Sequence, residues 1–319
     1  MTGGRIEYTE LDWRWAILLG AAIRDGLIEA VADRALPAEA VARDLCMDAR
    51  AVGVVLAALA ELGVLEEGRE GFRLLEEHRG PLLAQDHPDY VGQSVVHRFE
   101  LIGSWGRMPE ILRTGRPVED RTLPGFGGTE TFIAAMRRGA RPGAGAVADA
   151  VLARLPEGAS ILDVGGGPGT NAEAFAVGGA RVTVFDRPEV VGLMRESLAA
   201  SGIETASGDM NEGLPEGLFG AVYFGHTSHM YGPKENRALF ARMRRSLAPD
   251  GMLVVREYVR GLGEDAALFA ANMLVLTPRG GTYTAEEYER WLLGAGYDAI
   301  EYEPVAGRSS HLIFARRAG

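Results

Sequence analysis

The chain has 319 residues, of which 47% are hydrophobic and 24% charged, and its formal net charge is −11. This length exceeds one average domain and predicts a globular protein of two parts with a sizeable core. The acidic balance argues against contacts with nucleic-acid phosphates, and no apolar run approaches the roughly 18 residues needed to cross a membrane. The N-terminus lacks the basic-then-apolar order of a signal peptide. We therefore expect a cytoplasmic protein with no nucleic-acid or membrane partner.

The single cysteine and the densest basic cluster are consistent with these expectations. Cys46 is the only cysteine, which excludes an internal disulfide and a cysteine-based metal cluster, and we expect it to be a small buried apolar residue. The densest basic cluster is Arg242, Arg244 and Arg245, on a stretch with helical apolar spacing. We interpret it as a solvated helix face rather than a phosphate-binding patch.

The first third of the chain has the outline of a winged helix. Apolar residues recur at helical spacing from Trp13 to Val31 and from Ala38 to Leu65, and the segment GREGFRLLEEHRGPLL then has the pattern of a two-stranded wing. This outline raises DNA binding as a hypothesis. Residues 1–80, however, hold six more acidic than basic residues, whereas a groove-binding module should be basic. We therefore expect residues 1–95 to pack against a second copy of the chain.

The remainder, residues 96–319, is predicted to be a second domain of the α/β class. Residues 96–150 have the pattern of a helical connector, interrupted by the glycine-rich stretch 123–130, which we interpret as a mobile loop. From residue 151 onward, short β-branched runs alternate with helical stretches. That alternation is typical of βαβ units and predicts a Rossmann-like parallel sheet.

The strongest motif is a strand that runs into a glycine-rich turn and then a helix. It contains Asp163, Gly165, Gly166 and Gly167 in the segment ILDVGGGPG. Glycines let the backbone turn sharply and approach a ligand without a Cβ in the way. The pattern departs from the dinucleotide fingerprint, because Thr170 stands where the third glycine should be.

Two further acids follow at the ends of the next two predicted strands. Asp186, next to Arg187, comes 21 residues after Gly165, where a carboxylate can accept hydrogen bonds from ribose hydroxyls. Asp209 and Met210 follow the third strand and could flank an adenine ring. In this order the set resembles class I S-adenosylmethionine-dependent methyltransferases. The resemblance implies S-adenosylmethionine as cofactor and S-adenosylhomocysteine as product.

The fourth strand ends at Gly225 and is followed by His226 and His229. Ligands bind beyond the carboxyl ends of such strands, so both histidines are expected near the reactive end of the cofactor. Together with the N-terminal region, the segment from His229 to Glu235 resembles the dimeric small-molecule O-methyltransferases, which include plant caffeate-type and bacterial antibiotic-tailoring enzymes. The resemblance covers almost the whole chain and implies a homodimer.

The same resemblance assigns the catalytic roles. It implies that His229 is the general base and that Glu257, 28 residues further on, orients it. A third family acid would fall near Gly280 or Gly281 and is missing, and Met230 and Tyr231 replace the family's acid and tryptophan. A phenol with a pKa of about 10 is mostly protonated at pH 7, and a histidine with an ordinary pKa of about 6.5 is a suitable base for it.

His226 could share a helical face with His229, which raises metal binding as an alternative. Because the spacing shows no third ligand, we expect no metal and place His226 beside the methionine end of the cofactor. By family analogy, the pocket for a small-molecule acceptor is expected to use Phe132, Met136, Asn272 and Met273.

The sequence thus predicts a methyltransferase that acts on a phenolic or enolic hydroxyl in secondary metabolism. A C-methyltransferase acting on an activated carbon and a repurposed enzyme of this fold remain alternatives. A nicotinamide-dependent oxidoreductase and a DNA-binding regulator are more remote ones.

Overall fold

The computed structural model describes residues 8, 12–85, 87, 89–118 and 129–318, without the side chains of 129–131. Most of the glycine-rich stretch interpreted as a mobile loop lies outside these residues. The described part of the chain divides into two compact units, Met1–Gly106 and Arg107–Gly319. The boundary between the units falls just after helix α6 (Gly92–Trp105). This helix continues without a break through residue 95, where the boundary was expected.

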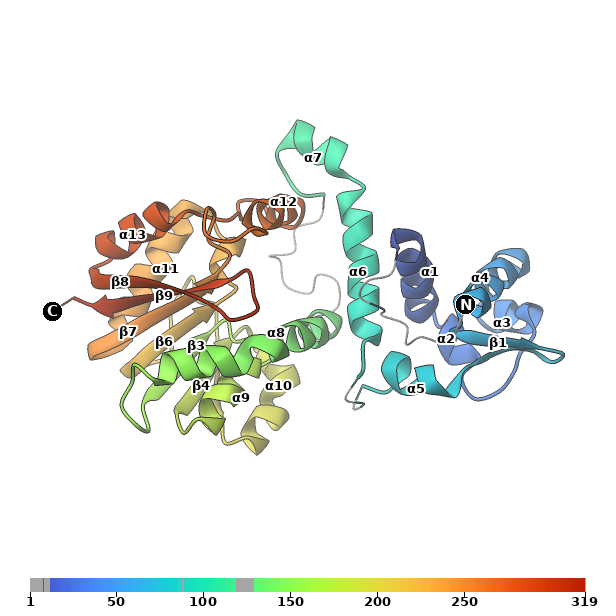
Figure 1. The fold of residues 1–319 in the computed structure, drawn as a ribbon, viewed down its shortest axis with the longest axis horizontal. Coiled ribbons are helices and arrows are strands. Elements are labelled where there is room, and N and C mark those ends of the chain that lie inside the picture. Colours follow the sequence, from blue (N-terminus) through green and yellow to red (C-terminus); the bar gives the residue numbers. More distant parts are fainter. Residues whose placement is uncertain (1–7, 9–11, 86, 88, 119–128, 319) are drawn as a thin grey trace. The chain divides into compact units, whose positions relative to one another are not determined.

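The first unit is mostly helical and carries a short hairpin (Figure 1). Its other elements are, in chain order, α1 (Trp13–Arg24), α2 (Leu27–Ala30), α3 (Ala38–Asp44), α4 (Ala49–Glu61), β1 (Leu65–Gly68), β2 (Gly71–Leu74) and α5 (Glu76–Leu83). The first apolar stretch is split into two helices at Gly26, whose left-handed backbone with φ of 82° ends the regular turn. Strands β1 and β2 pair antiparallel with Gly68 opposite Gly71, as expected for the wing.

The expectation that Cys46 is buried is wrong, because its side chain is exposed. The chain leaves α3 through a left-handed turn in which Cys46 has φ of 57°. That turn brings residue 46 to the surface between α3 and α4, away from the apolar core of the unit.

The second unit is built on a mixed sheet. Its elements are α7 (Met108–Thr114), α8 (Thr129–Leu152), β3 (Ser160–Val164), α9 (Thr170–Val177), β4 (Arg181–Asp186), α10 (Pro188–Ala200), β5 (Glu204–Ser207), β6 (Phe219–Gly225), the 3₁₀ helix η1 (Ser228–Met230), α11 (Pro233–Arg245), β7 (Leu247–Glu257), α12 (Ala266–Leu276), α13 (Ala285–Gly294), β8 (Tyr297–Pro304) and β9 (His311–Arg317). Among the described residues, seven strands form one sheet in the order β5-β4-β3-β6-β7-β9-β8. The first five are parallel, and β9 is antiparallel to both of its neighbours.

The order of the strands determines where a ligand is expected to bind. The chain proceeds outward from β3 through β4 to β5 and then returns to β6 on the other side of β3. Open α/β sheets bind ligands at such a switch point, in the crevice beyond the carboxyl ends of the strands. Here the switch point lies at the carboxyl ends of β3 and β6, where a ligand is therefore expected.

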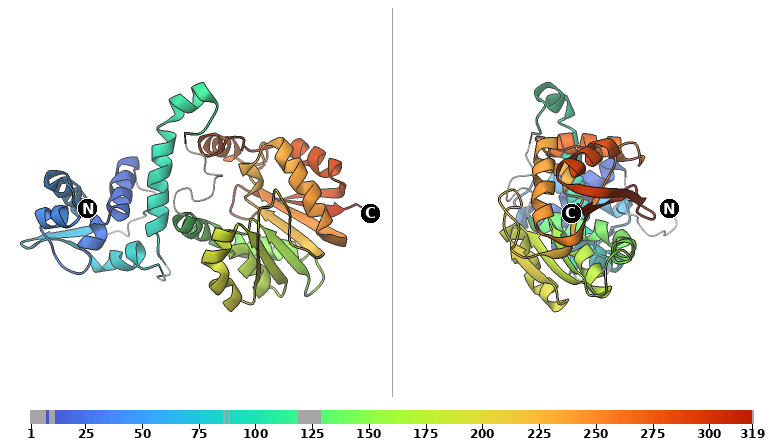
Figure 2. Two further views of the ribbon diagram at one scale, coloured as in Figure 1. Left: turned by 180° about the vertical axis from the view of Figure 1, so that it is seen from behind. Right: turned by 90° about the vertical axis from the view of Figure 1, so that its left-hand side faces the viewer.

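Helices cover both faces of this sheet (Figure 1). Val147 of α8 and Phe175 of α9 belong to the apolar core on one face, and Phe240 of α11 and Trp291 of α13 to the core on the other. Both views in Figure 2 show the strands between these two layers. The helices of the described residues include none long and apolar enough to cross a membrane.

The interpretation of the arginine cluster on α11 as a solvated face is wrong for two of its three members. Arg242 donates to the carbonyl of Met210 at 2.8 Å, and Arg244 donates to the carbonyls of Gly296 at 2.7 Å and Ala318 at 2.6 Å. Their guanidinium groups thereby bind backbone acceptors at the ends of other elements. Among the three, Arg245 alone is exposed.

Candidate functional site

The glycine turn after β3 has a backbone that favours glycine. Gly165, Gly167 and Gly169 have φ values of 69°, 50° and 73°, in the left-handed region that side chains with a Cβ rarely adopt. A Cβ at Gly165 would lie 2.9 Å from the hydroxyl oxygen of Thr227 and 3.3 Å from the methyl carbon of Met210. At Gly167 the nearest atoms would be 3.9 Å away. The turn is therefore packed at Gly165 and open at Gly167.

Asp186, at the end of β4, faces this turn. Its Oδ2 accepts a hydrogen bond from the backbone N–H of Gly167 at 2.8 Å, and its Oδ1 accepts one from the N–H of Arg187 at 2.7 Å. Burial raises the pKa of Asp186, although both backbone donors oppose the shift. The carboxylate thus connects the carboxyl ends of β3 and β4 at the edge where a ribose was expected.

Asp163 lies beneath the same turn and is almost fully buried. A Cβ at Gly166 would come within 2.9 Å of its carboxyl group, so glycine at 166 leaves room for it. Within the described residues, Oδ2 of Asp163 has no hydrogen-bond partner. Burial, and then the neighbouring charge of Asp186, raise the pKa of Asp163 to about 8. A buried carboxyl with an unpaired oxygen at this position is a suitable acceptor for a cationic or N–H group of a ligand.

The two residues expected at the adenine ring lie differently. Met210 is buried, and its methyl group reaches the glycine turn. Asp209 is exposed, and its Oδ1 accepts bonds from the backbone and side-chain nitrogens of Asn211 at 2.8 and 3.0 Å. Arg187 forms an ion pair with Glu189 at 3.3 Å. The structure therefore brings Met210 to the turn, while the Asp209 carboxylate binds its own loop.

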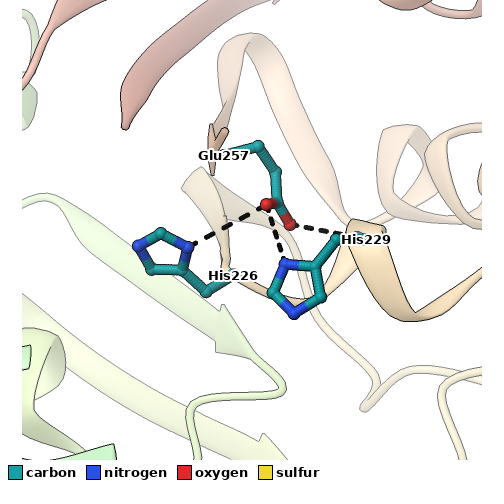
Figure 3. A group of neighbouring side chains, drawn as sticks. All are labelled: His226, His229 and Glu257. Carbon is teal, nitrogen blue, oxygen red and sulfur yellow. Dashed lines mark hydrogen bonds and ion pairs between the residues drawn. The ribbon is translucent and has the colours of Figure 1, made fainter. Parts of the chain in front are cut away.

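On the other side of the crevice, Glu257 positions His229. Nδ1 of His229 lies 2.8 Å from Oε2 of Glu257, and the backbone N–H of His229 donates to Oε1 at 3.1 Å (Figure 3). Glu257 ends β7, and His229 lies in η1 just after β6, so the pairing of these two strands brings them together. Burial raises the pKa of Glu257, but the charge and hydrogen bonds of His229 outweigh it, and the net shift is downward.

Three supporting residues were not found from the sequence. The hydroxyl of Ser228 donates to Oε1 of Glu257 at 3.1 Å and lies 2.7 Å from the hydroxyl of Tyr288. The side-chain amide of Asn236 donates to the carbonyl of Ser228 at 2.9 Å. Only the position of Ser228 next to His229 could have indicated this network, because Tyr288 is 60 residues away in the chain.

His226 faces the same carboxylate from outside η1 (Figure 3). Its Nδ1 is 3.9 Å from Oε2 of Glu257, and its backbone is left-handed with φ of 52°. Burial lowers the pKa of His226, and the charge of Glu257 opposes the shift only in part. One ligand atom from each of His226, His229 and Glu257 lies within 4.8 Å of the others, so the geometry offers Glu257 as the third potential ligand that the spacing did not show. The hydrogen bond to His229 satisfies the carboxylate without an ion.

Aromatic side chains surround the two histidines. The ring of Phe269, on α12, meets the His229 ring edge-on with centroids 4.9 Å apart and stacks on Tyr258 at 4.3 Å. Tyr258 in turn lies 5.2 Å from the His226 ring. These two aromatic residues were not identified from the sequence, because they follow β7 and precede the predicted pocket residues without a motif.

The four predicted substrate residues occupy two helices of the second unit. Phe132 and Met136 lie on α8, the first exposed and the second half-buried, and Asn272 and Met273 lie on α12, half-buried and buried. Of these two helices, α12 also carries Phe269, whose ring meets His229. Their role in an acceptor pocket stays a prediction.

Two glycines lie beside residues of the site. Gly225 ends β6, and a Cβ there would lie 2.6 Å from the Tyr223 hydroxyl. Gly281 occupies the region of the missing acid, and its backbone N–H donates to the carbonyl of His229 at 2.9 Å. Main chain therefore supports His229 where a carboxylate was expected.

Three features together define a class of enzyme. They are the Rossmann-like sheet, the open glycine turn joined to Asp186, and the histidine held by a glutamate beyond the switch point. The protein is an S-adenosylmethionine-dependent methyltransferase. A profile of the O-methyltransferase domain matches residues 131–298, about half of the chain, and the chain belongs to that family.

Two relatives and one solved structure illustrate the similarity. The chain is 29% identical, over 90% of its length and 89% of the relative's, to the tetracenomycin polyketide synthesis 8-O-methyl transferase TcmO of Streptomyces glaucescens. It is 32% identical, over 93% of its length and 90% of the relative's, to the 3-hydroxy-5-methyl-1-naphthoate 3-O-methyltransferase of Streptomyces sahachiroi. The structure described as PigF with SAH superposes with a TM-score of 0.76 at 24% identity, covering 96% of both chains.

Proposed function

We propose that this enzyme methylates a phenolic or enolic hydroxyl of a small aromatic molecule, with His229 as general base. The observation that carries the proposal is the 2.8 Å contact between Nδ1 of His229 and Glu257. A carboxylate on Nδ1 fixes the tautomer and leaves Nε2 as the proton acceptor. It also stabilises the imidazolium that forms when the hydroxyl proton is taken up.

The cofactor end of the site is proposed to use the residues around the glycine turn. Asp186 is suited to ribose hydroxyls, Met210 to the adenine face, and the open backbone at Gly167 to close approach of the ligand. Asp163 offers its unpaired Oδ2 to the amino group. When bound, S-adenosylmethionine supplies an electrophilic methyl group on its sulfonium sulfur. His226, one third exposed beside Glu257, is proposed to border the methionine end.

The acceptor end is proposed to be flat and aromatic. Phe269 and Tyr258 place two neighbouring rings, tilted by 30° to each other, next to His229, and planar rings pack well on aromatic surfaces. The names of both Streptomyces relatives specify methylation at oxygen, one of them on a naphthoate, which favours O- over C-methylation. Phe132, Met136, Asn272 and Met273 are proposed to shape the rest of the pocket.

The test is transfer of labelled methyl from S-adenosylmethionine to naphthols, hydroxyquinones and phenols, with the product position read by NMR. His229→Ala is expected to lower turnover by about 10²–10⁴-fold, the usual contribution of a positioned base. Affinity for S-adenosylhomocysteine should remain near that of the unchanged enzyme. His87→Ala, in the first unit, is the matched control. Methyl on carbon, or unchanged turnover of His229→Ala, contradicts the proposal.

We also propose that the enzyme is a homodimer formed through the first unit. The family resemblance supports this, as do the exposed apolar side chains of Trp13 on α1 and Val54 on α4, which are 60% and 61% accessible. Sedimentation equilibrium should give twice the chain mass of 34.2 kDa. A monomer at micromolar concentration refutes the assignment.

A further inference from the structure

Arg256 is a buried cation that the proposed chemistry does not use. It immediately precedes Glu257 on β7, and because side chains alternate along a strand, it points to the opposite face of the sheet. Arg256 is only 3% exposed. Its Nε donates to the hydroxyl of Ser310 at 3.1 Å. Within the described part of the chain, its Nη1 has no hydrogen-bond partner. Such a charge is costly to bury, and native proteins normally pair it.

The surroundings of Arg256 leave room for its guanidinium and add a second donor. A Cβ at Gly143, on α8, would lie 3.0 Å from Nη2, so the glycine accommodates the group. Tyr223, on β6, folds its ring back over Gly225, and its hydroxyl is buried. Burial raises the pKa of this phenol, and the charge of Arg256 and a side-chain hydrogen bond with it oppose the shift, so the two groups lie close together. A phenol and a guanidinium whose Nη1 is free among the described residues therefore lie side by side at one end of the sheet.

That end of the sheet is where the cofactor is proposed to bind. Tyr223 pairs directly with Asp163 of β3, and Arg256 pairs with Gly225 at the end of β6. Both therefore lie at the carboxyl ends of the strands next to the glycine turn. Asp186 marks the nucleoside side on β4, so the amino-acid end of the cofactor must extend from β3 toward β6 and β7 to bring its methyl group to His229. A carboxylate is the only anionic group of that ligand.

We propose that Arg256, assisted by the Tyr223 hydroxyl, binds the carboxylate of the methionine moiety of S-adenosylmethionine. A guanidinium pairs with a carboxylate through charge-assisted hydrogen bonds, which are roughly twice as strong as neutral ones. The pair supplies the missing partner of Nη1 and holds the amino-acid end in place, so that the methyl group is directed at the acceptor. This assignment rests on the cofactor and is independent of the acceptor's chemistry.

The test is calorimetric binding of two probes that differ only in the carboxylate: S-adenosylhomocysteine and its decarboxylated analogue, S-adenosyl-3-thiopropylamine. Arg256→Met should weaken S-adenosylhomocysteine by about 10- to 100-fold, as expected for a hydrogen bond to a charged group. The decarboxylated probe should bind both proteins within about twofold, since it makes no use of the arginine. Arg308→Met removes an exposed arginine that lies beside the same Gly143 and should change neither affinity.

Equal affinity of Arg256→Met and the unchanged protein for S-adenosylhomocysteine overturns the proposal, as does an equal loss for both probes. Circular dichroism establishes that the variant is folded. If it does not fold, Arg256→Lys and Tyr223→Phe are used instead. In each, the affinity for S-adenosylhomocysteine is divided by the affinity for the decarboxylated probe. A fall of at least about threefold in this ratio, relative to the unchanged protein, supports the proposal, and an unchanged ratio in both variants refutes it.

Discussion

Replacing Glu257 by glutamine tests the central contact of the site. The backbone N–H of His229 donates to Oε1, so this position takes the amide oxygen of the glutamine and the amide nitrogen faces Nδ1. Nδ1 must then accept from that nitrogen, and the imidazole carries its proton on Nε2 instead. Nε2 then faces the acceptor hydroxyl with a proton in place of a lone pair. Glu257→Gln therefore removes both the correct tautomer and the charge that stabilises the imidazolium.

The geometry gives the expected magnitude. Opposite charges 2.8 Å apart attract by about 6 kcal/mol at an effective dielectric constant of 20. Desolvation of the buried carboxylate offsets most of this, and a hydrogen bond to a charged group retains about 1.5–3 kcal/mol net. That range corresponds to about a 10- to 150-fold lower kcat.

Turnover is measured at saturating cofactor and acceptor, and cofactor affinity is measured separately by calorimetry. The matched control is Glu301→Gln, a surface acid on β8, which should leave kcat unchanged. An unchanged kcat in Glu257→Gln refutes the role given to the carboxylate. A loss of kcat that is matched by an equal loss of cofactor affinity refutes it too, because His229 and Glu257 are proposed to act on the acceptor and not to bind the cofactor.

Two further outcomes follow from the cofactor side. Because the pKa of Asp163 is raised to about 8 in the folded protein, the folded state holds a proton that the unfolded chain releases above about pH 4, and stability falls as pH rises toward 8. Asp163→Asn should remove this dependence on pH. The difference in melting temperature, variant minus unchanged protein, should therefore increase from pH 4 to pH 9, and a constant difference contradicts the raised pKa of Asp163. Gly167→Ala places a Cβ at the open part of the turn and imposes strain at φ of 50°, so S-adenosylhomocysteine should bind at least about tenfold more weakly, and wild-type affinity would show that the ligand does not approach there.

Much of the site could be predicted because its residues lie at the ends of strands. The glycine turn, Asp186, Met210 and His229 each follow a β-branched run, and parallel strands bring their carboxyl ends to one edge of the sheet. The order of the runs was therefore sufficient to place these residues at one edge of the sheet. Glu257 was assigned through the family resemblance, which implies an acid at the end of the fifth strand, 28 residues after His229.

Local structure was harder to predict where the backbone left the ordinary regions. Cys46 was expected in the core, but a left-handed turn exposes it. Arg242 and Arg244 were expected in solvent, but they bind carbonyls contributed by distant segments. In both cases, the composition of the neighbouring sequence suggested the environment, whereas the turn or the distant partner determined it.

The sequence by itself determined which chemical groups this enzyme has and at which edge of the sheet they gather, because hydrophobic periodicity and glycine conformation are local properties of the chain. Only the tertiary structure decided how those groups pair. It placed Glu257 between two histidines, brought Ser228 and Tyr288 behind it, and left Nη1 of Arg256 buried without a hydrogen-bond partner among the described residues. Contacts between residues far apart in sequence depend on strand pairing and helix packing, and those arise only when the whole domain buries its core.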